Sequence, residues 1–425
     1  MNNRWYKWVA LALLGGAYFF HQADRALFGL LTIPIQNELA LSDVQIGWIN
    51  TALSWTLALM ALVAGPVADR CSRKWIMTIS LMAWSVMTIM MGFVGEWHWG
   101  PLVLSAFVVT LLFRALATGV GESFFGPALP PYIAEYHHET RSLALSIMQA
   151  SLYIGLMTSG VIVASALGVL GSWRNVFIVF GAAGFALGVV FVGGLRSEKG
   201  KVKSEEVERS ERSEKGKVKG EKVGVLEGYR VFFKTPMAIR IMLGFVAIVF
   251  VNNAYLFWAP KYMSMKFGWG VEASGSATML YHHLFAFATI LAAGALSDRL
   301  VKKLPRFRIL LMRGALFAGA PCLLAIGLAP TATLMIVMTA AYGVFRGCFE
   351  CNTHAALYDY IAPKYRSSAG SVLIFSAFLI GGLSGVLMGA LADHYGVRGF
   401  EIGFAIMGAA YLLAGAALRE VKKEK

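Results

Sequence analysis

The chain is divided into apolar runs of roughly 20 residues, the length at which a helix crosses the hydrocarbon core of a bilayer. Twelve runs can be marked, with approximate bounds 8–31, 44–66, 75–95, 100–124, 143–168, 173–194, 238–260, 274–296, 307–328, 332–356, 368–391 and 400–418. Only 15% of the 425 residues are charged, against roughly 25% in soluble domains. The sequence therefore predicts an all-α membrane protein with twelve transmembrane helices. A soluble enzyme, a nucleic-acid-binding protein and a secreted disulfide scaffold are excluded.

Basic residues predict the orientation of these helices. If both termini are cytoplasmic, four of the 38 lysines and arginines fall on the opposite side and three fall within spans, which leaves 31 on the cytoplasmic side. The four are Arg174, Lys261, Lys266 and Arg398, and the three are Arg25, Arg114 and Arg346. Positive charge follows the cytoplasmic loops of membrane proteins. We therefore expect a multi-pass protein of a cell membrane, namely a bacterial inner membrane, with both termini cytoplasmic. The net charge of +14 is explained by this topology and requires no nucleic-acid partner.

The two halves of the chain are copies of each other. Gly65-Pro-Val-Ala-Asp69-Arg70-Cys-Ser-Arg73-Lys74 recurs 229 residues later as Gly294-Ala-Leu-Ser-Asp298-Arg299-Leu-Val-Lys302-Lys303. Further anchors keep nearly the same offset, namely Glu122 with Glu350, Arg141 with Arg366, and Ser159 with Ser384. A charged segment without apolar periodicity separates the copies. The expected domains are a six-helix bundle over 1–195, a cytoplasmic linker over 196–233 and a second six-helix bundle over 234–425.

The duplicated motif, in a 6+6 arrangement, resembles the major facilitator superfamily over essentially the whole chain. The resemblance implies two bundles around a central cavity that opens alternately to either side, with spans 1, 4, 7 and 10 lining it. The motif residues are then gating elements that hold the cytoplasmic side shut: Asp69, Arg70, Arg73, Asp298 and Arg299. The alternative is that they only set the topology and the loop turn.

Ionisable residues within apolar spans are costly and need a reason. Span 1 carries His21, Asp24 and Arg25, and span 4 carries Arg114 and Glu122. Span 10 repeats the pattern with Arg346, Glu350 and His354 at steps of four, so that they share one helix face. These stripes indicate sites that face protein or water. The alternative is that the charges pair internally and only hold helices together.

Asp24-Arg25 followed by Arg114 and Gly119-Val-Gly121-Glu122 resembles two subfamilies, the anion:cation symporters and the spinster-like transporters. The first resemblance implies that Arg25 holds an organic anion, that Asp24 and Glu122 handle protons, and that Arg114 modulates Glu122. As a departure from the family pattern, Arg114 stands one residue further from Glu122 than expected.

The second half offers amides, imidazoles and an indole, a lining suited to a hydroxylated anion such as a sugar acid. The expected substrate-binding residues are Arg25, His21, Asn253, Trp258, His283, Glu350 and His354. The predicted function is proton-coupled symport of a small organic anion by a monomer in the lipid bilayer, without an enzymatic activity, cofactor or metal. The alternatives are a spinster-like carrier or exporter of lysolipid-like molecules and a non-transporting sensor. For each histidine, the alternative role is packing or helix capping. Cys348 and Cys351 are interpreted as residues that pack between helices.

Overall fold

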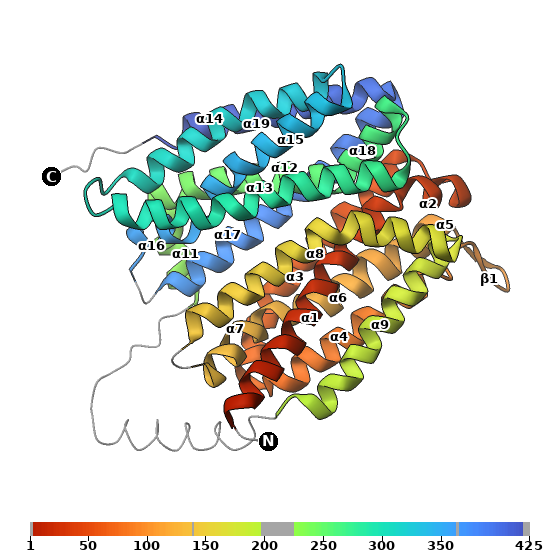
Figure 1. Cartoon of the computed structure of the whole chain (residues 1–425), viewed down its shortest axis with the longest axis horizontal. Helices are drawn as coiled ribbons and strands as arrows, with labels where there is room; N and C mark the ends of the chain where they lie inside the picture. The colour runs from red at the N-terminus through yellow and green to blue at the C-terminus, as the bar shows by residue number, and fades with distance from the viewer. Residues whose placement is uncertain (1–2, 138–139, 197–224, 363–364, 420–425) are drawn as a thin grey trace.

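The structure is a computed structural model that describes residues 3–137, 140–196, 225–362 and 365–419. These residues are helical except for loops and one antiparallel hairpin, β1 (Trp97–Trp99) and β2 (Leu102–Leu104). Eleven helical stretches of the described chain are long and apolar enough to cross a membrane. The remaining crossing, α1 (Asn3–Leu30), has 28 residues but carries the polar cluster of span 1. The predicted all-α membrane fold is confirmed (Figure 1).

Six crossings form the first bundle. The first to third are α1, α3 (Asp43–Arg70) and α4 (Arg73–Met91), with the short α2 (Thr32–Leu39) after α1. The fourth is a series of pieces: α5 (Ala106–Thr110), η1 (Leu111–Ala117), α6 (Thr118–Ser123) and α7 (Phe125–Tyr136). The last two are α8 (Arg141–Leu170) and α9 (Trp173–Gly194).

The second bundle repeats this order. Its single-helix crossings are α12 (Pro236–Phe267), α13 (Val271–Leu300), α14 (Phe307–Leu328) and α19 (Val397–Ala417). Its two broken crossings are α15 (Ala332–Glu350) with α16 (Thr353–Tyr360), and α17 (Arg366–Gly381) with α18 (Leu383–Tyr395). Glu122 and Glu350, which correspond in the repeat, both lie beside a break in their crossing. The duplication thus places one carboxylate at a helix break in each bundle.

The fourth crossing differs from its predicted bounds. It begins at Ala106 instead of residue 100, because residues 97–104 form the β-hairpin and Ser105 caps the helix by accepting from the Val108 amide. It also continues past residue 124 to Tyr136. Proline is tolerated in the first turn of a helix, and Pro127 occupies that turn of α7. A reading based on hydropathy alone misses both effects.

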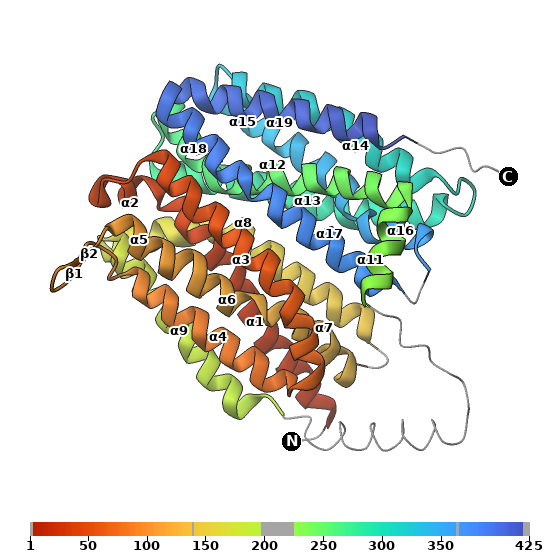
Figure 2. The same ribbon diagram turned by 180° about the vertical axis from the view of Figure 1, so that it is seen from behind.

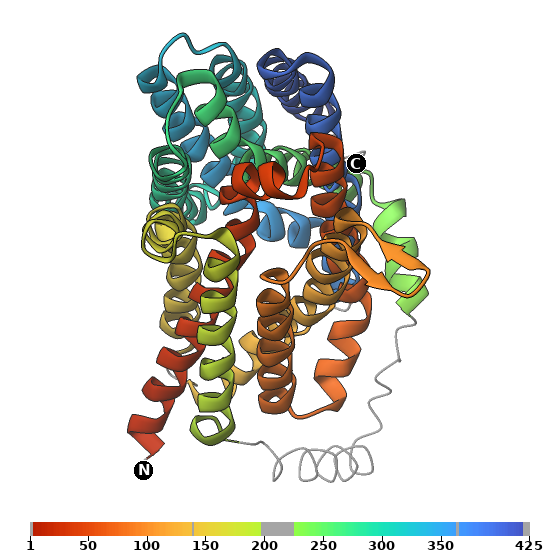
Figure 3. The ribbon, with the colours of Figure 1, turned by 90° about the vertical axis from the view of Figure 1, so that its right-hand side faces the viewer.

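The two bundles touch at the end of the molecule that lies away from both termini, which we call the far face, and diverge toward the end with the termini, the terminal face (Figures 1 and 2). Figure 3 views the molecule from the side of the far face, where the β-hairpin projects. Across this junction α3 packs along α18, and α8 packs along α13. Glycines allow the close approach: Gly47 faces the Gly385 backbone, and Gly160 faces that of Gly275.

The end of the predicted linker is folded. Residues 197–224 lie outside the described residues, whereas α11 (Val225–Lys234) packs against α17 and α12 of the second bundle. The Tyr365 hydroxyl donates a hydrogen bond to Glu227 at 2.5 Å. The described end of the predicted linker, α11, therefore belongs structurally to the second bundle.

Candidate functional site

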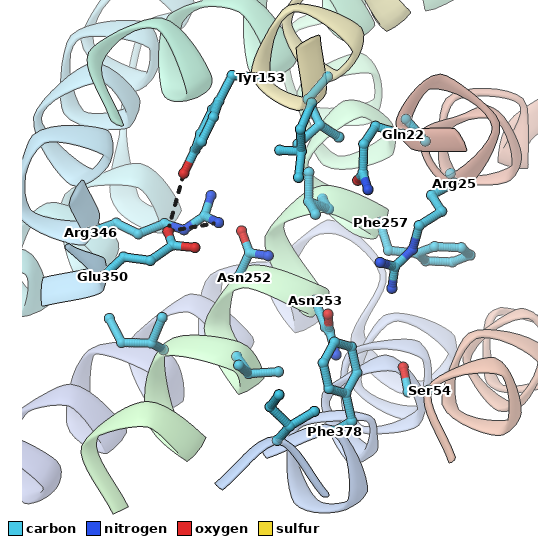
Figure 4. A pocket seen from close by; sticks show the side chains of 18 of the residues that line it. Gln22, Arg25, Ser54, Tyr153, Asn252, Asn253, Phe257, Arg346, Glu350 and Phe378 are labelled. Atoms are coloured by element: carbon cyan, nitrogen blue, oxygen red, sulfur yellow. Dashed lines mark hydrogen bonds and ion pairs between the residues drawn. The ribbon is translucent and has the colours of Figure 1, made fainter. Parts of the chain in front are cut away.

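A cavity of about 460 Å³ lies between the bundles (Figure 4). Its wall comes from α1, α3 and α8 of the first bundle and from α12, α15, α16 and α17 of the second. Among the described residues, none of the fourth crossing belongs to this wall, so the expectation that span 4 lines the cavity is wrong for this conformation. The reason is that Arg114 and Glu122 of that crossing point at α1, which lies between them and the cavity.

Asp24 and Arg114 form a buried ion pair behind the wall. Arg114 Nη1 lies 3.2 Å from Asp24 Oδ2, and Arg114 Nη2 donates to the main-chain carbonyls of Asp24 and Arg25, each at 3.2 Å. The hydroxyl of Thr88 on α4 donates to Asp24 Oδ1 at 3.0 Å. Both carboxylate oxygens of Asp24 are therefore hydrogen-bonded, which is what a buried charge requires.

A π-helix positions Arg114. The segment η1 is a π-helical stretch of seven residues with Arg114 in its middle, and the Thr118 hydroxyl bonds to the Phe113 carbonyl five residues back. Such a stretch inserts extra residues into a helix and often occurs at functional sites. The additional residue between Arg114 and Glu122 is thus accommodated in η1, and Arg114 reaches Asp24 rather than Glu122.

Glu122 is buried without a hydrogen bond. Its side chain is 1% exposed, and its nearest partners are His21 Nε2 at 3.6 Å and Arg25 Nε at 3.7 Å, both measured to Oε2. Neither carboxylate oxygen has a hydrogen-bond partner among the described residues. His21 is held in place by the Gln22 amide, 3.0 Å from its Nδ1. Glu122 is therefore close to a cation but only loosely held.

Arg25 connects this carboxylate to the cavity. Its side chain is 29% exposed and belongs to the cavity wall, and Figure 4 shows the guanidinium pointing into the space. The guanidinium also lies 5.9 Å from the ring of Phe378 on α17. Arg25 is thus a cation in contact with a buried carboxylate of its own bundle, the open cavity and the second bundle.

The opposite wall carries a second charge pair. Arg346 Nη2 lies 3.2 Å from Glu350 Oε2, and Arg346 Nη1 lies 2.9 Å from His282 Nε2. Tyr153 of the first bundle donates from its hydroxyl to Glu350 Oε2 at 3.4 Å. Both residues belong to the cavity wall, and the Glu350 side chain is the more exposed of the two, at 33% against 8% for Arg346.

The other predicted substrate-binding residues divide into two groups. Asn253 and His354 belong to the cavity wall, whereas His21 lies behind it at Glu122. Trp258 and His283 are fully buried away from the wall. Trp258 donates from Nε1 to the Gly385 carbonyl on α18, and His283 bonds through Nδ1 to the Met279 carbonyl. Because these bonds turn both side chains into helix contacts, neither can touch a substrate in this conformation.

The predicted gating residues lie at the terminal face. Asp69 and Arg70 end α3 and Arg73 begins α4, but the side chains of the first two are outside what the structure describes. Asp298 pairs with Arg308 at 2.9 Å, and Arg308 also pairs with Asp359 at 3.0 Å. Arg299 follows Asp298 and is exposed. Asp298, Arg308 and Asp359 all belong to the second bundle, so these ion pairs do not connect the two bundles, as expected where the bundles diverge.

The far face carries a polar contact that sequence reasoning missed. Asp393 of α18 accepts hydrogen bonds from the backbone amides of Asp43 and Val44 at 2.7 and 2.8 Å, and thereby caps α3 of the other bundle. Lys261 of α12 pairs with the Asp43 carboxylate and donates to Gln36 at 2.6 Å. In the sequence, Lys261 stands out only as one of the four basic residues on the side opposite to the cytoplasm. That unusual position is the sequence feature that could have indicated this contact.

Comparison with known proteins agrees with this architecture. Residues 14–372 match the family model described as Major Facilitator Superfamily. A probable L-galactonate transporter of Escherichia coli is 24% identical over 408 residues, which cover 94% of this chain and 86% of that protein. A probable galactarate/D-glucarate transporter of Escherichia coli is 27% identical over 292 residues, 66% of this chain and 64% of that protein. The crystal structure of a bacterial homologue of the lysosomal transporter spinster, inward-facing and unoccupied, superposes with a TM-score of 0.77 at 21% identity, covering 97% of this chain and 98% of that chain.

Proposed function

The chain belongs to the major facilitator superfamily and is a membrane transporter, and from this premise we propose that it carries a small organic anion, such as a sugar acid, in symport with protons. The relatives named as galactonate and galactarate/glucarate transporters support this substrate class. Transport proceeds by alternating access, in which the two bundles rock about the cavity between them.

The observation that carries the proposal is the position of Arg25. A guanidinium binds a carboxylate through two parallel hydrogen bonds. In Arg25 this group faces the cavity, and its contact with Glu122 is longer than a hydrogen bond, at 3.7 Å. The other arginine within the apolar spans of the first bundle, Arg114, is fully used by Asp24 and the main chain. A substrate carboxylate therefore finds one available guanidinium on this side of the cavity.

The same geometry supports coupling to protons. A substrate anion on Arg25 competes with Glu122 for the guanidinium. In the described part of the chain, Glu122 has no further lysine or arginine in contact and no hydrogen bond to stabilise its charge, and its other neighbour is the imidazole of His21. Because an unpaired buried charge is costly, loading the anion favours a proton on Glu122. Asp24, held by Arg114 and Thr88, is the second carboxylate of the pathway, and Arg114 affects Glu122 through the shared neighbour Arg25.

The direction of opening depends on the orientation in the membrane. With both termini in the cytoplasm, as the basic loops favour, the far face is extracytoplasmic and the described conformation is closed there. Opening it requires that Asp393 leave the start of α3 and that Lys261 leave Asp43. In the reverse state Asp69, Arg70, Arg73, Asp298 and Arg299 are proposed to close the cytoplasmic face. We propose a monomer in a bacterial inner membrane.

A lysolipid-like or other amphiphilic substrate is the alternative. It is favoured by the fold similarity to the bacterial spinster homologue. It is also favoured by the apolar part of the cavity wall, which includes Phe245, Ile248, Val249 and Ile374. An amphiphile would place its chain against these side chains and need Arg25 less.

The test is uptake into proteoliposomes. Labelled gluconate, glucuronate and a lysolipid are offered with and without an inwardly directed proton gradient. The proposal requires that a sugar acid accumulates above its external concentration only when the gradient is present. Uptake of the lysolipid with no response to either acid would establish the alternative, and gradient-independent equilibration of an acid would remove proton coupling.

A further inference from the structure

We propose that Glu350 makes this transporter selective for sugar acids with one carboxylate over those with two, by closing the end of the cavity opposite Arg25 with a negative charge. The inference rests on the proposed transport of sugar acids and specifies which of them fit. Figure 4 shows the arrangement: Arg25 lies on one side, the pair Arg346–Glu350 lies on the other, and Asn252 and Asn253 lie between.

The first step concerns which charge each wall presents. Arg25 is the cation that the first bundle contributes to the cavity wall, with 29% of its side chain accessible. On the opposite wall the accessible group is the carboxylate, because the Glu350 side chain is 33% exposed while that of Arg346 is 8% exposed. A ligand that spans the cavity therefore meets a cation at one end and an acceptor-only carboxylate at the other.

The second step is that Arg346 is not available to a ligand. One of its terminal nitrogens lies 2.9 Å from His282 Nε2 and the other 3.2 Å from Glu350. Its Nε has no partner among the described residues, but a carboxylate is bound through two nitrogens of a guanidinium, and both terminal nitrogens of Arg346 are already engaged. His282 is itself fully buried, so it fixes the guanidinium from behind. Arg346 belongs to the cavity wall, but a ligand carboxylate could bind its terminal nitrogens only by displacing Glu350 or His282.

The third step concerns the groups between the two ends. Asn252 Oδ1 and Asn253 Nδ2 are buried atoms without a hydrogen-bond partner in the described part of the chain, and both residues belong to the cavity wall. One is an acceptor and the other a donor, which together match a hydroxyl group. Unsatisfied buried polar groups favour a ligand that satisfies them. A chain of hydroxyls leading from Arg25 to Glu350 fits this arrangement.

These steps predict different affinities for gluconate and glucarate, two acids with the same carbon skeleton. Gluconate places its carboxylate on Arg25 and its terminal hydroxyl toward Glu350, to which it can donate. Glucarate replaces that hydroxyl by a second carboxylate, and two like charges in contact near a protein surface repel each other. We expect glucarate to bind on the order of 10-fold to 100-fold more weakly than gluconate.

The experiment measures dissociation constants of both acids on the full-length protein in nanodiscs, by isothermal titration calorimetry. Glu350→Gln removes the charge and keeps the shape, and the ratio of the two constants should fall by at least about 10-fold, mainly through tighter glucarate binding. Glu350→Asp keeps the charge and should keep a preference for gluconate. Glu401→Gln removes a carboxylate of the second bundle that pairs with Lys266 and is not part of the cavity wall, so the ratio should stay at the wild-type value.

The possible failures can be told apart. If both acids bind and the ratio is the same in wild type and Glu350→Gln, the selectivity role is wrong while the transport proposal stands. A wild-type preference for glucarate would also overturn the role. If neither acid binds to wild-type protein that is folded by its thermal unfolding curve, the sugar-acid proposal fails and the inference fails with it.

Discussion

Substituting Gly47 by alanine should open the far face. Gly47 lies on α3, and a Cβ added there would stand 2.5 Å from the Gly385 carbonyl oxygen and 2.8 Å from Val386 Cα, both on α18 of the other bundle. These are main-chain atoms, so no side-chain rotation can relieve the contact. Because the contact exists only where the bundles touch, the substitution penalises the conformation closed at the far face.

The size of the effect follows from the overlap. An ordinary contact begins at 3.4 Å, so α3 and α18 must separate by about 0.9 Å. Overpacking of this kind costs about 1–3 kcal/mol. Alanine also favours the helix by roughly 0.5–1 kcal/mol over glycine, but this gain is the same in both conformations and cancels. The population closed at the far face should therefore fall by about 5-fold to 150-fold relative to the open one.

Double electron–electron resonance between nitroxide labels at Asn37 and Thr333 reports the change. Both residues are exposed and lie on different bundles toward the far face. The distance distribution should shift to longer values in Gly47→Ala, and the uptake rate should fall because the return to the described conformation is disfavoured.

Two matched glycines serve as controls. Gly314→Ala adds a methyl group where no atom lies within 4 Å and should change neither distances nor uptake. Gly399→Ala places its Cβ against the Leu391 carbonyl within the second bundle. It should lower the thermal stability without a preference for either conformation. An unchanged distance distribution in Gly47→Ala would refute the reasoning, since the overlap would then be absorbed without separating the bundles.

Four further substitutions test the proposed mechanism. Asp24→Asn and Glu122→Gln should each abolish accumulation driven by the proton gradient while exchange of substrate across the membrane persists, and normal accumulation in both would remove the two carboxylates from the proton pathway. Arg25→Lys keeps the charge but loses the bidentate geometry, so sugar-acid binding should weaken by at least about 10-fold in calorimetry, whereas undiminished stabilisation by lysolipids would favour the amphiphile. Asp69→Asn should weaken closure of the terminal face and lengthen distances between labels there, and unchanged distances with unchanged transport would leave Asp69 with a role in topology.

The sequence predicts the crossings well because each apolar run is decided locally by its own composition. The twelve spans, the repeat and the family follow from patterns that need no knowledge of packing. The bounds of the fourth crossing do not, since the hairpin at 97–104 and the π-helical stretch η1 depend on hydrogen bonds that hydropathy does not encode.

The pairing of charges is the part that the sequence leaves open. The chain order places Arg114 and Glu122 on one crossing, and the resemblance to the anion:cation symporters implies that Arg114 acts on Glu122. The π-helix turns Arg114 toward Asp24 instead and leaves Glu122 to Arg25. Likewise, the polar character of Trp258 and His283 predicts a lining role, but their hydrogen bonds to main-chain carbonyls direct them away from the cavity. Partner choice depends on the three-dimensional path of the helices, which spacing alone does not give.

The number of residues between the arginine and the glutamate of each half determines whether the two side chains pair with each other. In the second bundle Arg346 precedes Glu350 by four residues, one helical turn, so the two side chains pair on their own helix. In the first bundle Arg114 precedes Glu122 by eight residues with η1 between them, and its partner is on α1. The span that corresponds to α1 in the repeat has Asn253 where α1 has Asp24, and therefore offers Arg346 no carboxylate.

Under the proposed mechanism, this difference decides which of the two glutamates exchanges a proton. Glu350 has a guanidinium in hydrogen-bond reach and a tyrosine hydroxyl at 3.4 Å, both of which hold its charge. Glu122 has neither, and the cation nearest to it is the one that a substrate anion would claim. The duplicated carboxylate can thus serve as a fixed charge in one bundle and as a proton site in the other. The two glutamates should therefore respond differently to the same substitution. A Glu122→Gln variant should lose coupling and keep selectivity, while Glu350→Gln should lose selectivity and keep coupling. Uptake of gluconate and glucarate with and without a proton gradient measures both properties in each variant, and loss of coupling in Glu350→Gln would contradict the division.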